Sequence, residues 1–190
     1  LFLHGDRTFG GALTQWVLFN LNEQRIVRPS PDDSFYTRLM HNEDCGVDFL
    51  PRVPQNTVLA PLCTRRVHKS DTDINGHVNN MVWLDWVQQI AGAHWEAAAR
   101  PQDQAAYAWF VTRHEIDYRG NIAEGDTVTA HTFIPGPPKG ARFVRCVEFL
   151  DAAGKKLVEV RSTWAMIDKA SGRAMRIPPK VAAPFLPDQA

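Results

Sequence analysis

Apolar residues recur at spacings of three and four along the segment from Val78 to Arg100. Such spacing places side chains on one stripe of an α-helix, so the sequence predicts a long helix over 78–100. The stripe consists of Val78, Met81, Val82, Trp86, Val87, Ile90, Ala93 and Ala97. Trp83 and Leu84 widen it, and we therefore expect the rest of the protein to cover this helix on most sides.

Stretches with strand character flank the predicted helix. One strand is predicted before it, over 57–68, and further strands follow over 107–118, 127–134, 141–150 and 156–167. Residues 121–126 predict a turn, and Asp151-Ala152-Ala153-Gly154 predicts the tip of a hairpin. The order of one strand, one long helix and then four or more antiparallel strands indicates the α+β class, with an antiparallel β-sheet wrapped around a long central α-helix.

A weak internal repeat links the start of the chain to its end. Trp16-Val17-Leu18-Phe19-Asn20 resembles Trp164-Ala165-Met166-Ile167-Asp168 at an offset of 148 residues. In the same register, Arg25 matches Arg173 and Arg28 matches Arg176. We therefore predict that residues 1–56 are the end of a truncated first repeat plus a linker, and that residues 57–190 form the main domain. The alternatives are a chance similarity, or an appendage on a single domain that dimerises.

Charge and cysteine content narrow the functional classes. Lys+Arg and Asp+Glu both number 21, so the net charge is zero and the basic excess of a general nucleic-acid binder is absent. The cysteines, Cys45, Cys63 and Cys146, are odd in number and widely spaced, which argues against a disulfide framework or a zinc site. The sequence has no evident secretory signal and no apolar run near the ~20 residues that span a bilayer. We therefore expect a cytoplasmic protein with no membrane span, no metal and no cofactor.

The segment directly before the predicted helix is rich in polar groups. It reads Asp71-Thr72-Asp73-Ile74-Asn75-Gly76-His77-Val78-Asn79-Asn80. One interpretation is a polar loop in which Asn75 or Asn79 caps the helix. The other is a catalytic loop, because a helix N-terminus presents unpaired N–H groups and a partial positive charge that can hold a carbonyl oxygen as it becomes an oxyanion.

In the catalytic interpretation each side chain of this loop has a role. Asp73 can activate a water molecule or attack a carbonyl carbon directly. Asn75 can orient that carboxylate or the water, and His77 can carry a proton because imidazole titrates near neutral pH. Gly76 allows a tight turn or a close approach of the substrate.

The loop resembles the signature Asp-x-Asp-x-Asn-x-His-Val-Asn-Asn of acyl-ACP thioesterases and, more loosely, the Asp-x-Asp-x-x-Gly loop of the 4-hydroxybenzoyl-CoA thioesterase family. Glu115-Ile116-Asp117-Tyr118-Arg119, followed by Glu124-Gly125-Asp126, resembles the strand and turn after the helix in those families. Residues 164–178 resemble their last strand and proline-terminated tail. The resemblance covers residues 57–187 and implies the hotdog fold, in which a sheet wraps a long central helix.

The resemblance also implies site residues. Three fall on the family's catalytic positions, namely Asp73, Asn75 and His77. Where plant acyl-ACP thioesterases have a catalytic Glu followed by Cys, a gapless match puts Asn121 and Ile122 here, which excludes a cysteine nucleophile at that site. Asn121 can still position water, or Glu124 can replace the missing carboxylate.

Further residues are expected to contact the substrate, namely Gly76, Val78, Asn79, Trp83 and Asn121. N–H groups near Val78 and Asn79 are expected to form the oxyanion hole. Trp83, Trp86 and Trp95 fit a hydrophobic core, with an acyl chain along the same helix as an added role. Basic groups form a solvated face or a landing site for coenzyme A phosphates or an acidic carrier protein; they are Arg65–Arg66, Lys155–Lys156 and the set Lys139, Arg142 and Arg145.

The predicted function is hydrolysis of an acyl thioester, releasing a carboxylic or fatty acid from acyl-ACP or acyl-CoA in lipid metabolism or fatty acid biosynthesis. A second hypothesis is a non-catalytic hotdog module that binds an acyl thioester or a partner protein, and a hydratase or dehydratase ranks last. Acyl-ACP thioesterases carry two hotdogs in tandem, so the repeat implies a tandem pseudo-dimer. A homodimer is the alternative, because a lone hotdog leaves a sheet edge open. Either carrier, and either a covalent or a general-base mechanism, is compatible with the sequence.

Overall fold

The computed structural model describes residues 2–4, 6–14, 18–20, 22–23, 25–28, 30, 50 and 61–186. The chain divides into two compact units, residues 1–48 and residues 49–190. Within the described ranges, every helix is too short or too polar to cross a membrane.

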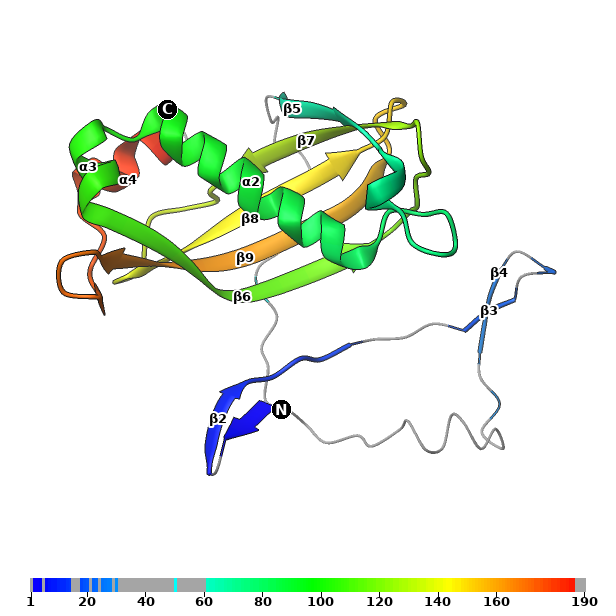
Figure 1. Ribbon diagram of the computed structural model, residues 1–190, viewed down its shortest axis with the longest axis horizontal. Coiled ribbons are helices and arrows are strands. Elements are labelled where there is room, and N and C mark those ends of the chain that lie inside the picture. Colours follow the sequence, from blue (N-terminus) through cyan, green and yellow to red (C-terminus); the bar gives the residue numbers. More distant parts are fainter. Residues whose placement is uncertain are drawn as a thin grey trace. The chain divides into compact units, whose positions relative to one another are not determined.

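The larger unit contains one long helix and a curved antiparallel sheet (Figure 1). Its elements are β5 (Pro61–Arg66), a 3-10 turn (Lys69–Asp71), α2 (Asn80–Ala98), α3 (Pro101–Ala106), β6 (Tyr107–Tyr118), β7 (Thr127–Phe133), β8 (Arg142–Leu150), β9 (Lys156–Asp168), β10 (Arg173–Ala174), α4 (Pro179–Ala182) and a second 3-10 turn (Ala183–Phe185). These bounds confirm the predicted α+β order. Pro101 follows the last turn of α2 closely, and a proline cannot continue the helix ladder.

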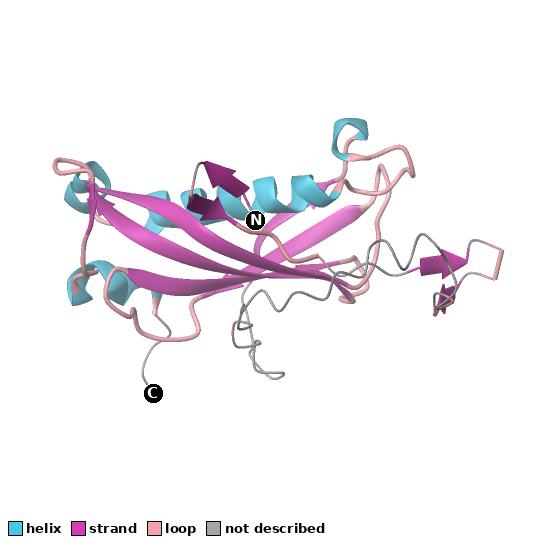
Figure 2. Cartoon of the chain, turned by 90° about the horizontal axis from the view of Figure 1, so that it is seen from below, coloured by secondary structure: helices cyan, strands magenta, loops and turns pink. Residues whose placement is uncertain are grey.

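The sheet is antiparallel throughout its described strands. β6 pairs with β9, β9 with β8, β8 with β7, and β7 with β5, while β10 pairs with the end of β9. Seen from below, the helix and the sheet form two layers (Figure 2). β8 and β9 form the hairpin expected around residues 151–154, where the Asp151 carboxylate accepts bonds from the N–H groups of Ala153 and Lys155.

The core lies between α2 and one face of the sheet. Trp83, Trp86, Val87 and Ile90 of the helix pack with sheet residues, among them Val128, Val147, Phe149, Val158 and Val160. The opposite side of α2 is exposed, and Met81 is 68% exposed. The expectation that α2 is covered on most sides is therefore wrong, as is the placement of Met81, Ala93 and Ala97 in the buried stripe. The described sheet covers one side of the helix, and the buried stripe is centred on Trp83 and Trp86 instead.

The described residues of the smaller unit form two short hairpins. β1 (Phe2–His4) pairs with β2 (Arg7–Gly10), and β3 (Leu18–Asn20) pairs with β4 (Arg25–Val27). The β3–β4 hairpin and the β9–β10 hairpin have the same register at the offset of the sequence repeat. Asn20 pairs with Arg25 in the first, and Asp168 pairs with Arg173 in the second. The turn closures also correspond: Asn20 Oδ1 accepts from the N–H of Glu23 at 3.1 Å, and Asp168 Oδ2 accepts from the N–H of Ser171 at 3.0 Å. The repeat thus extends from sequence to local geometry, although Trp16 lies outside the described residues.

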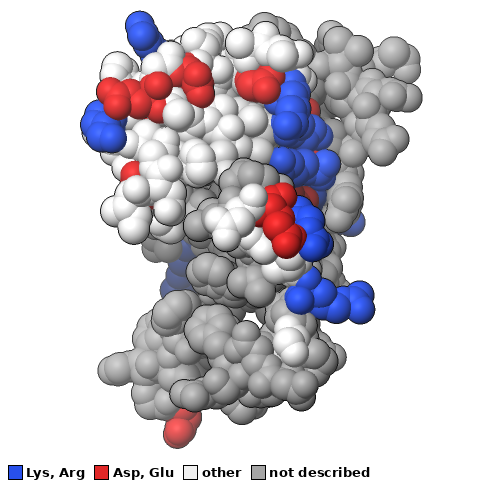
Figure 3. All heavy atoms as spheres, turned by 90° about the vertical axis from the view of Figure 1, so that its right-hand side faces the viewer, with Lys and Arg blue, Asp and Glu red and all other residues white. Residues whose placement is uncertain are grey.

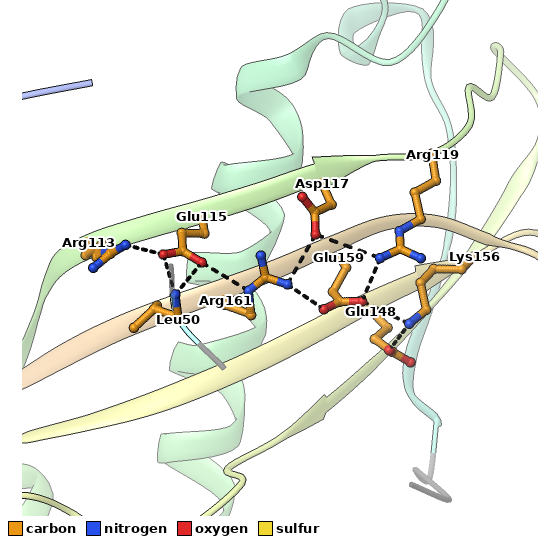
Figure 4. A network of polar contacts seen from close by, with 9 residues as sticks. All are labelled: Leu50, Arg113, Glu115, Asp117, Arg119, Glu148, Lys156, Glu159 and Arg161. Carbon is orange, nitrogen blue, oxygen red and sulfur yellow. Dashed lines mark hydrogen bonds and ion pairs between the residues drawn. The ribbon is translucent and has the colours of Figure 1, made fainter. Parts of the chain in front are cut away.

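A network of charged side chains lies on the sheet face opposite α2 (Figure 4). Its centre is Arg161 of β9, which bonds Glu159 Oε1 at 2.8 Å, Asp117 Oδ2 at 3.2 Å and Glu115 Oε2 at 3.2 Å. Glu115 also accepts from Arg113 and from the backbone N–H of Leu50. Lys156 pairs with Glu148 and Glu159, and Arg119 pairs with Asp117 and Glu159. Every buried carboxylate of the network therefore meets at least one cation.

Candidate active site

The polar loop before α2 is held closed by its own backbone. Thr72 and Val78 form an antiparallel bridge, and the Asp73 N–H donates to the His77 carbonyl at 2.8 Å. The Gly76 N–H donates to the Asp73 carbonyl at 3.1 Å. Gly76 has φ of +76°, a conformation that glycine adopts without strain, so this residue allows the tight turn. The loop therefore presents a defined shape directly before the helix.

The Asp73 carboxylate lies at the centre of this loop. Its Oδ1 accepts from the backbone N–H of Asn75 at 2.8 Å and of His77 at 3.4 Å, and its Oδ2 accepts from Asn75 Nδ2 at 3.4 Å. The backbone bond from Asn75 is the main cause that lowers the pKa of Asp73 below its ordinary value. Asp73 is therefore ionised at neutral pH. The structure thus brings Asp73, Asn75 and His77 together.

The start of α2 is capped by a side chain. Asn79 Oδ1 accepts from the Met81 N–H at 2.9 Å, which is the capping interaction expected of Asn79. The N–H of Val78 donates to the Ile122 carbonyl at 3.1 Å, and the N–H of Asn79 donates to the Asp71 carbonyl at 2.8 Å. These two groups serve the fold and do not form an open oxyanion hole. Among the described residues, the first helical N–H, that of Asn80, has no hydrogen-bond partner.

The segment after β6 returns to this loop. His77 and Ala123 form an antiparallel bridge, a register that puts Asn121 across from Asn79. Asn121 is exposed. Glu124 also lies on this segment, and its carboxylate is 4.0 Å from Lys69 Nζ. Asn121, which the resemblance matches to the family's glutamate position, thus lies on a segment that borders the loop.

Trp83 is packed in the core. It is 2% exposed, and its ring centroid lies 5.1 Å from that of Trp86 and 5.0 Å from that of Phe149. Of the three tryptophans expected on this helix, Trp86 borders the hollow beside the loop and Trp95 lines a second cavity; both are described below. The core position expected of Trp83 is thus confirmed, and its contact with an acyl chain stays a prediction.

A hollow of about 240 Å³ adjoins the loop. It is lined by Arg65, Arg66, His68, Asp71 and Trp86, and Asp73 is not among these residues. Arg65 Nη2 donates to Gln89 Oε1 at 2.6 Å, and its guanidinium lies over the Trp86 ring at 5.7 Å from the centroid. In the view of Figure 3, carboxylates and basic side chains lie next to one another on the surface. The hollow is thus a basic pocket beside an acidic loop.

The other basic residues are partly exposed and partly buried or paired in the folded chain. Lys139, Arg142 and Lys155 are exposed, whereas Lys156 belongs to the charged network. Arg145 is 3% exposed, so its assignment to a solvated or phosphate-binding face is wrong. The described residues contain no cluster of three or more side chains suited to a metal ion, and Cys63 and Cys146 are free thiols.

Comparisons with known proteins agree on the fold. Residues 67–185 match the family model of the thioesterase-like superfamily. Similar solved structures include a candidate oleoyl thioesterase from Lactobacillus plantarum, with a TM-score of 0.61, 21% identity and coverage of 69% of this chain and 52% of that chain. The 12:0-ACP thioesterase from Umbellularia californica has a TM-score of 0.59 and 16% identity, with coverage of 67% of this chain and 51% of that chain. A 1,4-dihydroxy-2-naphthoyl-CoA thioesterase from Synechocystis has a TM-score of 0.56 and 16% identity, with coverage of 65% of this chain and 93% of that chain.

These similarities confirm the predicted hotdog fold. The chain spans about half the length of the Lactobacillus and Umbellularia proteins and nearly all of the Synechocystis protein. No curated protein sequence matches the chain.

Proposed function

Because this chain belongs to the thioesterase-like superfamily, we propose that it hydrolyses acyl thioesters and releases a carboxylic acid from acyl-ACP or acyl-CoA. The observation that carries the proposal is the loop at the start of α2. There the Asp73 carboxylate accepts hydrogen bonds from Asn75 and from the backbone N–H of His77. In this reaction water supplies the oxygen that adds to the thioester carbonyl carbon, the C–S bond breaks, and the thiolate takes up a proton from that water; after direct attack by Asp73, the same water hydrolyses the resulting mixed anhydride.

The loop supports a role for each residue. Asp73, ionised because its pKa is lowered, is the proposed nucleophile toward the carbonyl carbon or the group that activates a water molecule. The unpaired N–H of Asn80 is the helix-terminal donor suited to the developing oxyanion. His77 is exposed beside Asp73 and is positioned to protonate the leaving thiolate. Gly76, Val78, Asn79 and Asn121 shape the opening around the carbonyl.

The carrier is proposed to contact the hollow beside the loop. Arg65 and Arg66 supply two guanidinium groups there, and arginine binds phosphate through paired N–H donors. Phosphates occur in coenzyme A and in the prosthetic group of acyl carrier protein, so both carriers fit. Hydrolysis of either would belong to cytoplasmic fatty acid metabolism.

A second hotdog is proposed to complete the site, because the loop is exposed on this domain. The equal registers of β3–β4 and β9–β10 support a tandem pseudo-dimer, in which residues 1–56 are the end of a first hotdog and its linker. A homodimer of the 57–190 domain is the alternative. Size-exclusion chromatography with light scattering tests the alternative, because a homodimer of the 57–190 domain predicts twice the mass of the chain.

The test of hydrolysis is a panel of acyl-CoA and acyl-ACP substrates of graded acyl length. Wild type is compared with Asp73→Ala and with the control Asp85→Ala, since Asp85 lies on the exposed side of α2 and accepts a hydrogen bond from Gln89 of the same helix. We expect Asp73→Ala to lower turnover about 10²–10⁴-fold, the range for loss of a catalytic group. Asp85→Ala should retain wild-type turnover. Equal turnover by Asp73→Ala and wild type rejects the assignment.

The alternative is a hotdog module that binds a thioester without hydrolysing it. It is favoured by Asn121, which stands where the family's catalytic glutamate is expected, and by the bonds that tie the Asp73 carboxylate to its own loop. Binding of panel members without release of free thiol from any of them would establish this alternative.

A further inference from the structure

A second cavity lies toward the other end of α2. Its volume is about 200 Å³, and its walls come from the second half of α2, from β6, β8 and β9, and from the C-terminal segment around α4. Trp95, Trp109, Phe143 and Phe185 give it an aromatic lining. The Trp95 ring centroid lies 5.6 Å from that of Phe185 and 5.3 Å from that of Trp109, so ring contacts hold the walls in place.

Two residues that line the cavity each carry an N–H donor without a hydrogen-bond partner in the described part of the chain. These donors are Nε of Arg145 and Nε1 of Trp164, and both atoms are buried. Phe143 faces Trp164 and Arg145 faces Ser162 across β8 and β9, so Arg145 and Trp164 project from the same face of the sheet. Buried donors are nearly always paired in folded proteins, and two unpaired donors on one cavity point to a missing acceptor.

The charge of Arg145 is also unpaired. Its Nη1 donates to Thr132 Oγ1 at 2.9 Å and to His94 Nδ1 at 3.1 Å, and no carboxylate in the described part of the chain forms an ion pair with it. Burial and the neighbouring Arg145 lower the pKa of His94, so that ring is neutral at neutral pH. Burial lowers the pKa of Arg145 to about 10, which leaves the guanidinium charged. An unpaired buried cation is costly, and an anion in the cavity relieves that cost.

We propose that this cavity binds a small apolar carboxylic acid, whose carboxylate bonds Arg145 Nε and Trp164 Nε1 and whose apolar body lies among the aromatic rings. The single cation suits a monoanion, and the apolar walls disfavour the more highly charged phosphates. Since a cavity of about 150 Å³ holds benzene, this one has room for about one ring or a chain of six to eight carbons.

The proposed site is separate from the Asp73 loop and goes beyond hydrolysis. Its nearest α2 residue, Gln88, lies about 12 Å along the helix from Asn80 at the rise of 1.5 Å per residue. The buried Trp83 and Trp86 lie between them on that helix. Binding at this site therefore does not require turnover, and it can be measured whether or not the thioesterase proposal holds.

The experiment is calorimetric titration of the full chain with phenylacetate and hexanoate, each beside its uncharged match, phenylacetamide or hexanamide. Arg145→Met removes the charge and keeps an apolar stem. Arg142→Met is the matched control, because Arg142 is exposed on the same strand. Trp164→Phe keeps a ring and removes only the second donor. Circular dichroism establishes that each variant is folded.

We expect wild type and Arg142→Met to bind an acid at least tenfold more tightly than its amide. Arg145→Met should lose that preference, and Trp164→Phe should weaken acid binding severalfold. The proposal is overturned if wild type binds neither acid, if acids and amides bind equally, or if Arg145→Met binds the acids as wild type does. If Arg145→Met does not fold, unchanged acid binding by Trp164→Phe also overturns it.

Discussion

Arg145 and Arg161 are both 3% exposed and lie on adjacent strands of one sheet, but their surroundings differ. Arg161, on the face away from α2, meets the carboxylates of Glu115, Asp117 and Glu159. Arg145, on the face toward α2, meets a hydroxyl and a neutral imidazole. No carboxylate pairs with it among the residues that the structure describes.

The difference separates two uses of a buried charge. On the outer face the chain supplies all the opposite charges itself, so the network contributes to the fold and needs no ligand. On the inner face the cation borders a cavity, and its counter-charge is left to a bound molecule. Removing each arginine should therefore have opposite effects on stability.

The largest effect is expected from Arg161→Met. This change leaves Glu115, Asp117 and Glu159 without their shared cation, and breaking a buried ion pair on one side costs about 3–5 kcal/mol. Urea unfolding should show this loss in the free energy of unfolding. A loss below about 1 kcal/mol, the value typical of surface pairs, would mean that the network is effectively solvated.

The second-largest effect is expected from acid, which should weaken the charged network around Arg161. Burial by itself raises the pKa of Glu159, but its bonds and charge interactions with Lys156 and Arg161 outweigh burial, and the net pKa lies below the ordinary 4.5. A carboxyl whose pKa is lowered by folding contributes stability above its unfolded pKa and loses it as the pH falls through the folded pKa. The urea midpoint should be flat above about pH 5.5 and fall below pH 4.5, with a shallower fall in Glu159→Gln. Parallel curves for the two proteins would contradict this assignment.

Arg145→Met should have a smaller effect of opposite sign. Without ligand it should match wild type or gain about 1 kcal/mol, because it removes an unpaired buried charge. Thermal unfolding of ligand-free protein measures this difference. A loss of several kcal/mol would show that the chain itself balances Arg145, and would remove the contrast with Arg161.

Arg119→Met should have the smallest effect. Its side chain is 42% exposed, and it pairs with Asp117 and Glu159 at 3.8 and 3.5 Å. Exposed ion pairs contribute about 0–1 kcal/mol, so Arg119→Met should lower the free energy of unfolding by no more than that. Comparing this loss with that of Arg161→Met shows how much more the centre of the network contributes than its edge. A loss as large as that of Arg161→Met would place the energetic centre at Arg119.

The fold was largely predictable because it rests on local patterns. The spacing of apolar residues located α2, and strand alternation with turn residues located β6 to β9 within a residue or two. The exposure of Met81 was not predictable, since it depends on which side of the helix the sheet covers. α3, α4 and β10 are short, and their sequences carry no periodicity that identifies them.

The two sites differ in the same respect. The Asp73 loop is continuous in sequence, so one motif located it. The cavity draws residues from α2, three strands and the C-terminal segment, and only folding assembles them. From the sequence alone, Arg145 is grouped with exposed basic residues. However, Phe143, Arg145 and Val147 occupy every second position of β8 and therefore lie on the same, buried face. That alternation was the available signal for its burial.

Turnover of Asp73→Asn tests the central claim, that this carboxylate carries out thioester hydrolysis, most directly. Asparagine keeps an oxygen that can accept from the N–H groups of Asn75 and His77, so the loop should hold its shape. We predict that kcat/KM for an acyl thioester falls at least about 100-fold, with an unchanged melting temperature. Turnover within a few-fold of wild type would contradict the account.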